Sequence, residues 1–191
     1  MKRLLDIILS AICLVVFSPL FVICAVAIYL EDRLPVIYSQ ERVGLHGRTF
    51  RIYKFRSMRI DAEPDHEPRL LEITGDSRLT HVGRFLRNHH LDELPQLWNV
   101  LKGDMSFVGY RPERPYYINQ IVKLDPRYMQ LYAIRPGITS YATLYNGYTN
   151  TMEKMLRRLD LDLQYLHHHN LLIDARILLL TFVSIVSGRT F

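Results

Sequence analysis

Two adjacent carboxylates, Asp92 and Glu93, stand shortly before a proline in the stretch "LDELPQLWNVLKG". One interpretation is structural: an N-cap and a first-turn acid, both favourable at the positive end of a helix that begins near Pro95. The other is chemical: one carboxylate ligates a hard cation such as Mg2+ while its neighbour acts as nucleophile or base. A glycosidase pair fits poorly, because its carboxylates approach one bond from opposite sides of a sugar.

Arginines surround this acid pair and recur beside proline or glycine turns: Arg84, Arg87, Arg111, Arg114 and Arg135. Lys54 and Arg56, near the end of an expected strand, add to the positive charge. Any one of them fits an ordinary surface cation, but planar guanidinium groups bind phosphate oxygens bidentately. Together with the acids they indicate a diphosphate substrate, neutralised by Arg and Mg2+ during phosphoryl transfer. We expect the arginines and a helix N-terminus to favour the charged form of both acids.

Composition limits the class of protein. The chain has 191 residues, enough for one domain with a core, and a formal net charge of +5 that favours phosphates, nucleic acid or acidic lipid headgroups. Both cysteines, Cys13 and Cys24, lie in an apolar stretch, so we expect no disulfide framework and a reduced, intracellular catalytic domain. No GxxxxGK[ST] phosphate loop occurs, and the successive histidines 167–169 point too far apart on a helix to share one metal ion.

The N-terminal segment is apolar from position 4 to position 30 apart from one aspartate. As one helix it would be roughly 40 Å long, enough to cross a hydrocarbon core of about 30 Å. Pro19, after Ser18, instead predicts a kink or break in the middle. Basic residues on both flanks, Arg3 and Arg33 among them, favour both ends on the cytoplasmic face. A kinked spanning helix and a re-entrant helix-break-helix, in which Ser18 supplies a backbone partner at the break, both fit.

The remaining chain predicts an α+β fold that is mainly helical. Residues 35–58 predict a hairpin with Gly44 and Gly47 at its turn, and 61–80 predict a polar loop. A cap at Thr149 or Asn150 begins a long helical region. Its last part, an apolar helix at about 171–186, is expected either to lie as an amphipathic helix in a membrane interface or to dock on the N-terminal apolar segment. Further short elements are predicted at 81–90, 95–103 and 115–123 (helices) and at 139–145 (a strand).

Six stretches of the chain together match the pattern of one family: "KRLLDIILS", the Ser18–Pro19 break, "QERVGLHGRTFRIYKFRSM", "RLTHVGRFLRNHHLDELPQLWNVLKGDMSFVGYRPERP", "RPGIT" and "DLDLQYLHHHNLLIDARILLLTFVSIVSG". With them the chain resembles the bacterial sugar transferases, the monotopic phosphoglycosyl transferases that start glycan assembly on polyprenyl phosphate. The resemblance covers nearly the whole chain. It is to the minimal form of the family, without the extra N-terminal membrane bundle of larger members.

The resemblance implies a re-entrant membrane helix over 1–34, broken at Ser18 and Pro19, and a catalytic unit over 35–191 with amphipathic interfacial helices. It implies the cytosolic face of the bacterial inner membrane as the location and Mg2+ as the cofactor. The implied partners are a UDP-sugar, a polyprenyl phosphate and membrane lipid, with a homo-oligomer and downstream glycosyltransferases as further associations and no nucleic acid.

For the site, the resemblance implies a two-step reaction. Asp92 attacks the β-phosphate of a nucleotide diphosphate-sugar and releases UMP, and Glu93 then assists the polyprenyl phosphate in displacing the sugar-phosphate from Asp92. Arg87 and Arg111 would contact phosphates, and Arg135 would join them near the nucleotide.

One residue departs from the family pattern, and two other functions compete. Tyr110 stands where the family has the first proline of Pro-Arg-Pro, which puts the geometry of that turn in question. A catalytically dead relative acting as a membrane scaffold is one alternative. A binder of anionic lipid or nucleic acid is the other, and it rests on charge alone. Specificity for the sugar is expected in 61–80 or around 141–152.

Overall fold

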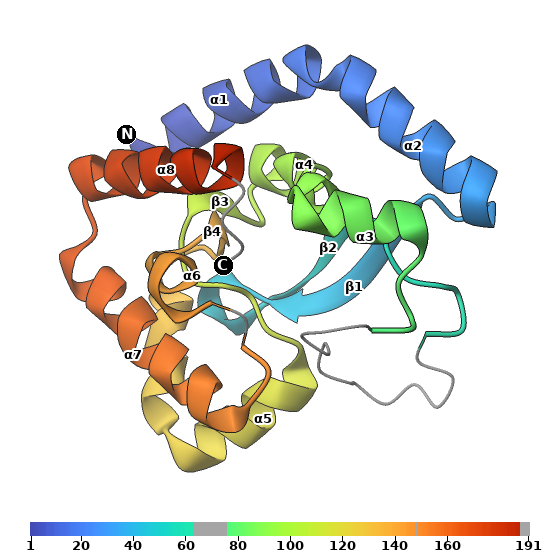
Figure 1. The fold of residues 1–191 in the computed structure, drawn as a ribbon. Helices are drawn as coiled ribbons and strands as arrows, with labels where there is room; N and C mark the ends of the chain where they lie inside the picture. Colours follow the sequence, from blue (N-terminus) through green and yellow to red (C-terminus); the bar gives the residue numbers. More distant parts are fainter. Residues whose placement is uncertain (63–75, 148, 188–191) are drawn as a thin grey trace.

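The computed structural model describes residues 1–62, 76–147 and 149–187 (Figure 1). The α-helices are α1 (Lys2–Val16), α2 (Ser18–Asp32), α3 (His81–Asn88), α4 (Gln96–Lys102), α5 (Pro115–Leu124), α6 (Tyr141–Asn146), α7 (Met152–His168) and α8 (Leu171–Val186). The strands and 3-10 helices are β1 (Ile37–Val43), β2 (Thr49–Phe55), β3 (Ser106–Val108), β4 (Gly137–Thr139), η1 (Leu45–Gly47), η2 (Leu91–Glu93) and η3 (Pro126–Ala133). The predicted mainly helical α+β class is confirmed. Of the predicted polar loop 61–80, positions 63–75 lie outside the described residues.

The N-terminal helix pair bends by 60° between α1 and α2. Pro19 stands in the first turn of α2, where its missing N–H is not needed, and the Ser18 hydroxyl donates to the Val15 carbonyl at 2.7 Å. The predicted break, with Ser18 as a backbone partner, is therefore confirmed. Cys13 and Cys24 are free thiols, as expected. Within the described chain no single helix has the length and apolar character to cross a membrane, whereas the bent pair has both when its helices are taken together.

Large apolar side chains are exposed along α1, α2 and α8. On α1 and α2 they include Leu4, Ile12, Val15, Val16, Val22, Ile23, Val26 and Leu30. On α8 they include Leu172, Leu179, Phe182, Val183 and Val186. Figure 1 shows α1 and α2 as an arch above a row formed by α8, α4 and α3. An exposed apolar surface of this extent indicates contact with a partner or a membrane.

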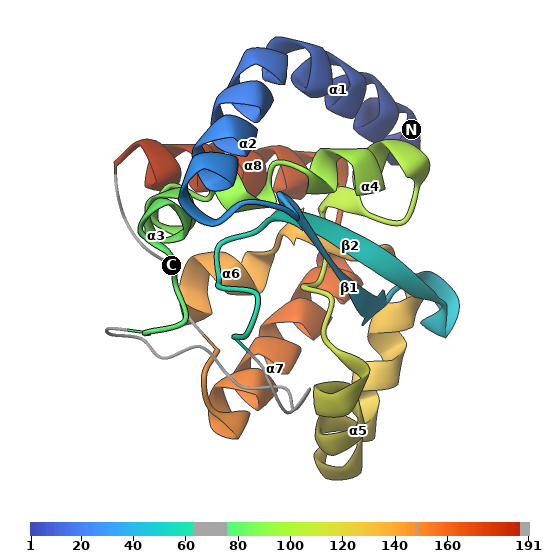
Figure 2. The ribbon, with the colours of Figure 1, turned by 90° about the vertical axis from the view of Figure 1, so that its right-hand side faces the viewer.

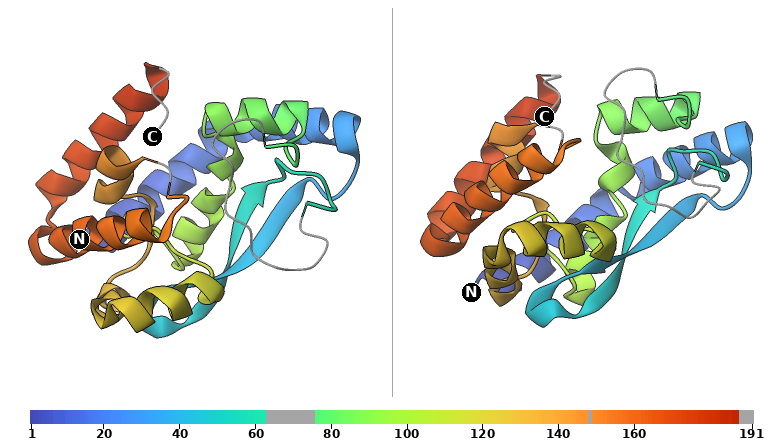
Figure 3. Two further views of the ribbon diagram at one scale, coloured as in Figure 1. Left: turned by 60° about the horizontal axis from the view of Figure 1, so that its bottom comes forward. Right: turned by 90° about the horizontal axis from the view of Figure 1, so that it is seen from below.

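The predicted hairpin is confirmed as β1 and β2, which pair antiparallel along their whole length. Gly47 at its turn adopts φ +71°, a conformation that favours glycine. The Asn99 side chain of α4 fixes the hairpin, accepting the Tyr53 N–H at 3.0 Å and donating to the Arg51 carbonyl at 2.7 Å. Figure 2 shows the hairpin between the α1–α2 pair above it and α5 and α7 below it, and Figure 3, from below, shows the hairpin beside α5. These contacts hold the end of β2, and with it Lys54, close to α4.

The second sheet is a short parallel pair, β3 and β4. The strand predicted over 139–145 is wrong, because β4 ends at Thr139 and α6 follows immediately. The Ser140 hydroxyl caps α6 by accepting the Thr143 N–H at 2.9 Å. The aromatic and β-branched residues that suggested a strand therefore lie on a helix.

α7 begins slightly later than predicted. Thr151 is its N-cap, rather than Thr149 or Asn150, and its hydroxyl accepts the Lys154 N–H at 3.2 Å. The other predicted helices are confirmed with small shifts at their ends, as α3, α4 and α5. α4 stops where expected, with Gly103 in the left-handed conformation at φ 106°.

The main core lies between α5, η3 and α7, and Tyr110 is part of it. Tyr110 is fully buried, in the same cluster as Ile121 and Leu131. Its hydroxyl donates to the Val43 carbonyl at 3.4 Å, and its own carbonyl accepts the Gly137 N–H at 2.8 Å. The residue that replaces the expected proline thus packs inward, and its backbone remains bonded to β4.

We expect Tyr110→Ala to lower the free energy of unfolding by roughly 3–5 kcal/mol, because it removes a buried ring and leaves a cavity. Tyr116→Ala is the matched control on α5, where half of the side chain is exposed, and it should change that free energy by less than about 1 kcal/mol. Denaturant unfolding in detergent measures both variants. Equally small effects would contradict a core position for Tyr110.

Candidate active site

Asp92 and Glu93 lie together in η2, a single 3-10 turn that joins α3 to α4. His90, directly before it, adopts a left-handed conformation with φ 55° and ψ 18°. Pro95 is the N-cap of α4, and no side chain caps that helix. The two acids therefore do not cap α4, and the interpretation of the pair as a helix cap is wrong.

Glu93 is held between two cations from different elements. Its Oε1 accepts hydrogen bonds from Lys54 Nζ at 2.5 Å and from Arg111 Nη2 at 3.3 Å. Lys54 comes from the end of β2, and Arg111 follows β3. Burial alone would raise the pKa of Glu93, but these two cations outweigh it and hold the pKa well below its usual range. Glu93 is therefore charged near neutral pH, as predicted.

Asp92 differs from its neighbour. It is only 5% exposed, and its carboxylate accepts no hydrogen bond from the residues that the structure describes. Burial raises the pKa of Asp92, against the opposing charge of Lys54, and the charge of Glu93 adds to the rise. The prediction that the charged form of both acids is favoured therefore holds for Glu93. It is wrong for Asp92, because desolvation outweighs the nearby cations.

Arg87 stands in the last turn of α3, shortly before the acid pair in the chain. Its Nη1 is buried and has no hydrogen-bond partner in the described chain, and its charge acts to lower the pKa of Asp92. A phosphate could use such a guanidinium, which has donors left over. The hard oxygens of Asp92 fit Mg2+, which often binds through one or two carboxylates together with substrate phosphates.

Larger metal sites are absent from the residues described here. Among residues 1–62, 76–147 and 149–187, no group of three or more His, Cys, Asp or Glu side chains could hold an ion. The histidines 167–169 are exposed. A metal ion at Asp92 would therefore share its coordination with substrate and water.

Comparison with known proteins decides the family. The sequence profile described as "Bacterial sugar transferase" matches residues 1–188. The chain belongs to the bacterial sugar transferase family. The resemblance found in the sequence motifs is thereby confirmed over nearly the whole chain.

Relatives of this chain carry names that specify their substrates. An Aeromonas hydrophila protein named UDP-N-acetylgalactosamine-undecaprenyl-phosphate N-acetylgalactosaminephosphotransferase is 40% identical over 98% of this chain and 44% of its own length. A UDP-glucose:undecaprenyl-phosphate glucose-1-phosphate transferase of Klebsiella pneumoniae is 39% identical over 94% of this chain and 39% of its own length. One of Caulobacter vibrioides is 39% identical over 97% of this chain and 70% of its own length. The chain thus spans less than half of the first two relatives.

Arg56 lies at the end of α2. It is buried, and its Nη2 donates to the carbonyls of Asp32 at 2.7 Å and Arg33 at 3.0 Å. A guanidinium there satisfies the last carbonyls of a helix and complements its dipole. These contacts give Arg56 a helix-capping role, and substrate binding by Arg56 stays a prediction.

Arg135 lies at the opposite end of α4 from the acid pair. Its Nε donates to the Gly103 carbonyl at 2.9 Å, and its side chain lines a cavity of about 180 Å³ together with Arg3. α4 has seven residues, which at 1.5 Å per residue separates its two ends by roughly 10 Å. The structure therefore does not bring Arg135 to Glu93, and its role near a nucleotide stays a prediction.

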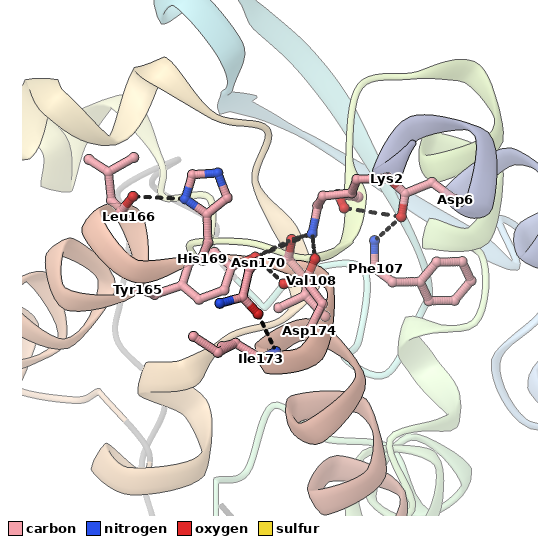
Figure 4. Close-up of polar contacts among 11 residues, drawn as sticks. Lys2, Asp6, Phe107, Val108, Tyr165, Leu166, His169, Asn170, Ile173 and Asp174 are labelled. Carbon is pink, nitrogen blue, oxygen red and sulfur yellow. Dashed lines mark hydrogen bonds and ion pairs between the residues drawn. The ribbon is translucent and has the colours of Figure 1, made fainter.

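The same cavity adjoins a polar network that ties the first helix to the last (Figure 4). Lys2 Nζ donates to the Val108 carbonyl at 2.9 Å and to the Asp174 carboxylate at 2.6 Å. The Tyr165 hydroxyl donates to the same carboxylate at 2.5 Å. α1 and α8, two of the three helices along which large apolar side chains are exposed, are thereby fixed to each other and to β3.

A buried charged cluster beside Arg111 was not predicted. Arg158 on α7 donates to Glu113 at 2.6 Å, and Asp162, one turn later, accepts the backbone N–H of Arg111. Burial raises the pKa of Asp162 to about 7, against the opposing effects of Arg158 and that N–H. The signal in the sequence is the i, i+4 spacing of Arg158 and Asp162 on the same helix face as Leu159, a face that should be apolar. Of the remaining predicted cations, Arg84 is an exposed residue of α3 and Arg114 is the N-cap of α5.

Asp162→Asn should change how stability depends on pH. Because the folded state raises the pKa of Asp162 from 3.8 to about 7, this group destabilises the native state progressively as pH rises between those values. The asparagine variant should therefore gain roughly 1–3 kcal/mol of unfolding free energy over the wild type at pH 8 and nothing at pH 4. Denaturant unfolding at several pH values measures this, with Asp160→Asn on the exposed face as control. A constant difference across the pH range would contradict it.

Proposed function

We propose that this sugar transferase moves a sugar-1-phosphate from a UDP-sugar to undecaprenyl phosphate through a covalent intermediate on Asp92, releasing UMP and starting the assembly of a cell-surface glycan. One observation carries the proposal: within the described residues the buried carboxylate of Asp92 accepts no hydrogen bond, Glu93 next to it binds two cations, and Arg87 Nη1 has no hydrogen-bond partner. The names of the relatives supply the substrate class.

The first step forms one bond and breaks one bond. An Oδ of Asp92 attacks the β-phosphorus of the UDP-sugar, and the bond between that phosphorus and the bridging oxygen of UMP breaks, so UMP leaves with the electron pair. The sugar-phosphate remains on Asp92 as an acyl phosphate. In the second step an oxygen of undecaprenyl phosphate attacks the same phosphorus, and Asp92 leaves as a carboxylate. The product is an undecaprenyl diphosphate sugar.

The charged residues around Asp92 have two roles, binding the substrate phosphates and favouring the ionised form of Asp92. Lys54 and Arg111 share Glu93, so one anion orients both cations toward the position of the substrate phosphates. Arg87 comes from a third element, α3, and its Nη1, unpartnered among the described residues, can donate to a substrate phosphate. Mg2+, when bound through Asp92 and Glu93, would neutralise part of the diphosphate charge. Burial raises the pKa of Asp92 and so favours its neutral form. Lys54, Arg87 and a bound Mg2+ would oppose this effect and favour the ionised carboxylate that attacks the phosphorus.

We infer a monotopic location on the cytoplasmic membrane, with the site on the cytosolic face. The bent α1–α2 pair and the exposed apolar residues of α8 support this, because together they offer one apolar surface to a single leaflet. A UDP-sugar is soluble and undecaprenyl phosphate is a lipid, so an enzyme at this surface brings both to one site. Covalent catalysis allows the two substrates to bind in turn.

The topology makes a separate prediction. Cysteines introduced at Lys2 and at Arg33 should both react with a membrane-impermeant thiol reagent from the cytoplasmic side, in a variant whose two natural cysteines are replaced. A re-entrant helix pair requires the same side for both positions. Labelling of the two positions from opposite sides would contradict the re-entrant topology and support a kinked spanning helix.

The activity is tested by UMP release from a panel of UDP-sugars, with the full chain in vesicles that contain undecaprenyl phosphate. We expect release from at least one sugar nucleotide, with loss of activity in EDTA and recovery in excess Mg2+. UDP-glucose and UDP-N-acetylgalactosamine head the panel because relatives are named for them. A wild type that is inactive across the panel would favour the scaffold alternative.

A further inference from the structure

The start of α3 is held by an acid from the N-terminal helix pair. Glu31, in the last turn of α2, accepts the backbone N–H of His81 at 2.6 Å and that of Val82 at 2.8 Å, one with each carboxylate oxygen. Thr80 caps the same helix by accepting the Gly83 N–H at 2.9 Å. A helix leaves its first N–H groups without internal partners, and here a residue fifty positions earlier supplies two of the acceptors.

The end of α2 is itself fixed to the catalytic unit. Arg56 binds the carbonyls of Asp32 and Arg33 and lies 3.2 Å from the Asp32 carboxylate. Arg56 directly follows β2, the strand that carries Lys54. The last turn of α2, the end of β2 and the first turn of α3 therefore meet at one point, next to each other in Figures 1 and 2.

An apolar cluster continues this junction to the acid turn. Ile28 of α2, Phe55 of β2 and Leu86 of α3 are buried together. Leu91 and Leu94, which flank the acid pair, pack against the same cluster. A shift of α3 relative to α2 would therefore move the side chains on both sides of Asp92 and Glu93.

We propose that Glu31 is a positioning residue, which couples the end of the membrane-facing helix pair to Arg87 on α3 and through it to Asp92. This inference rests on the proposed function, in which Arg87 binds a phosphate of the sugar nucleotide. Glu31 does not reach the reacting atoms. It fixes the first turn of α3, and Arg87 lies in the last turn of that eight-residue helix.

Glu31→Ala tests the coupling by kinetics, with the full chain in vesicles. We expect kcat to fall roughly 10- to 100-fold, since small displacements of a group that positions substrate have effects of this size. Glu31→Gln, which keeps one good acceptor, should lie between Glu31→Ala and the wild type. Glu153→Gln is the matched control, because Glu153 is an exposed acid in the first turn of α7, which Thr151 already caps, and it should retain wild-type kcat.

A double-mutant cycle separates positioning from general destabilisation. In an Arg87→Ala background, Glu31→Ala should lower kcat less than about threefold further, because the group that it positions is already gone. An equal fold-loss in both backgrounds would mean that Glu31 only stabilises the fold and would overturn the proposal. Wild-type kcat in Glu31→Ala alone would also overturn it.

A second readout needs no turnover and so separates this inference from the proposed function. Amide hydrogen exchange over residues 81–94 should be faster in Glu31→Ala than in the wild type, and unchanged in Glu153→Gln. Unchanged exchange in Glu31→Ala would overturn the positioning role whether or not the protein turns over UDP-sugar. If the wild type releases no UMP but Glu31→Ala still exchanges faster than the wild type, the proposed function is contradicted and the coupling stands.

Discussion

Asp92→Asn is expected to lower turnover of the UDP-sugar by about 10⁴-fold or more, because the neutral amide cannot form the acyl phosphate. The same substitution should leave the fold intact. Since burial already raises the pKa of Asp92, a neutral side chain of the same shape removes a desolvation penalty, and thermal unfolding should occur at the wild-type temperature or slightly above it. Release of UMP and thermal unfolding of the same preparation measure the two effects.

The control for Asp92→Asn is Asp160→Asn, which neutralises an exposed carboxylate paired with Arg127. It should retain wild-type turnover. Loss of both activity and thermal stability in Asp92→Asn would make Asp92 a structural residue. Wild-type turnover in that variant would make the proposed mechanism wrong.

Lys54→Met should produce the second large effect, a loss on the order of 10²- to 10³-fold in kcat/KM. Lys54 is the cation that most strongly opposes the raised pKa of Asp92, and it also holds Glu93. Without it the pKa of Asp92 rises further, so a higher pH is needed to form the reactive carboxylate. The acidic limb of the pH profile of kcat/KM should therefore move to higher pH.

Lys102→Met is the matched control for Lys54→Met, because Lys102 is more than half exposed at the far end of α4 and pairs with Asp104. Its pH profile should overlay that of the wild type. An acidic limb that stays in place in Lys54→Met would show that Lys54 does not act on the reactive carboxylate. A smaller kcat/KM with an unchanged profile would leave Lys54 as a phosphate contact alone.

Local signals in the sequence predicted the elements of this fold well. Pro19 breaks the N-terminal helix because it lacks an N–H and has a fixed φ. Gly103 ends α4 because glycine readily adopts the left-handed conformation found there. The strand predicted over 139–145 failed for a related reason. Ser140 begins a helix there through one capping hydrogen bond, and that signal competed with the strand propensity of its neighbours.

The site was harder to predict, because it depends on which distant groups meet. The grouping of Asp92, Glu93 and Arg87 follows from their closeness in the chain. Lys54 joins them only because Asn99 fixes the hairpin on α4, a contact that no local pattern reports. Arg56 carries the same charge two residues later and instead caps α2, so residue type alone does not separate a substrate-binding cation from a structural one.

Burial explains the remaining disagreement between sequence and structure. From the sequence, the neighbouring arginines favour ionisation of both acids. In the part of the chain that the structure describes, Glu93 has two direct cation partners, whereas Asp92 has none and is almost fully buried. The sign of the pKa shift at Asp92 therefore depends on solvent exclusion, which a charge pattern does not reveal.

The most direct test of the central claim is the mass of the protein after incubation with a UDP-sugar and Mg2+ in the absence of undecaprenyl phosphate. We expect one equivalent of UMP to be released and the intact mass to rise by one sugar-phosphate, on the peptide that contains Asp92, with no such rise in Asp92→Asn. Addition of undecaprenyl phosphate should then restore the original mass. Release of UMP only when undecaprenyl phosphate is present, with no adduct under any condition, would contradict a covalent intermediate on Asp92.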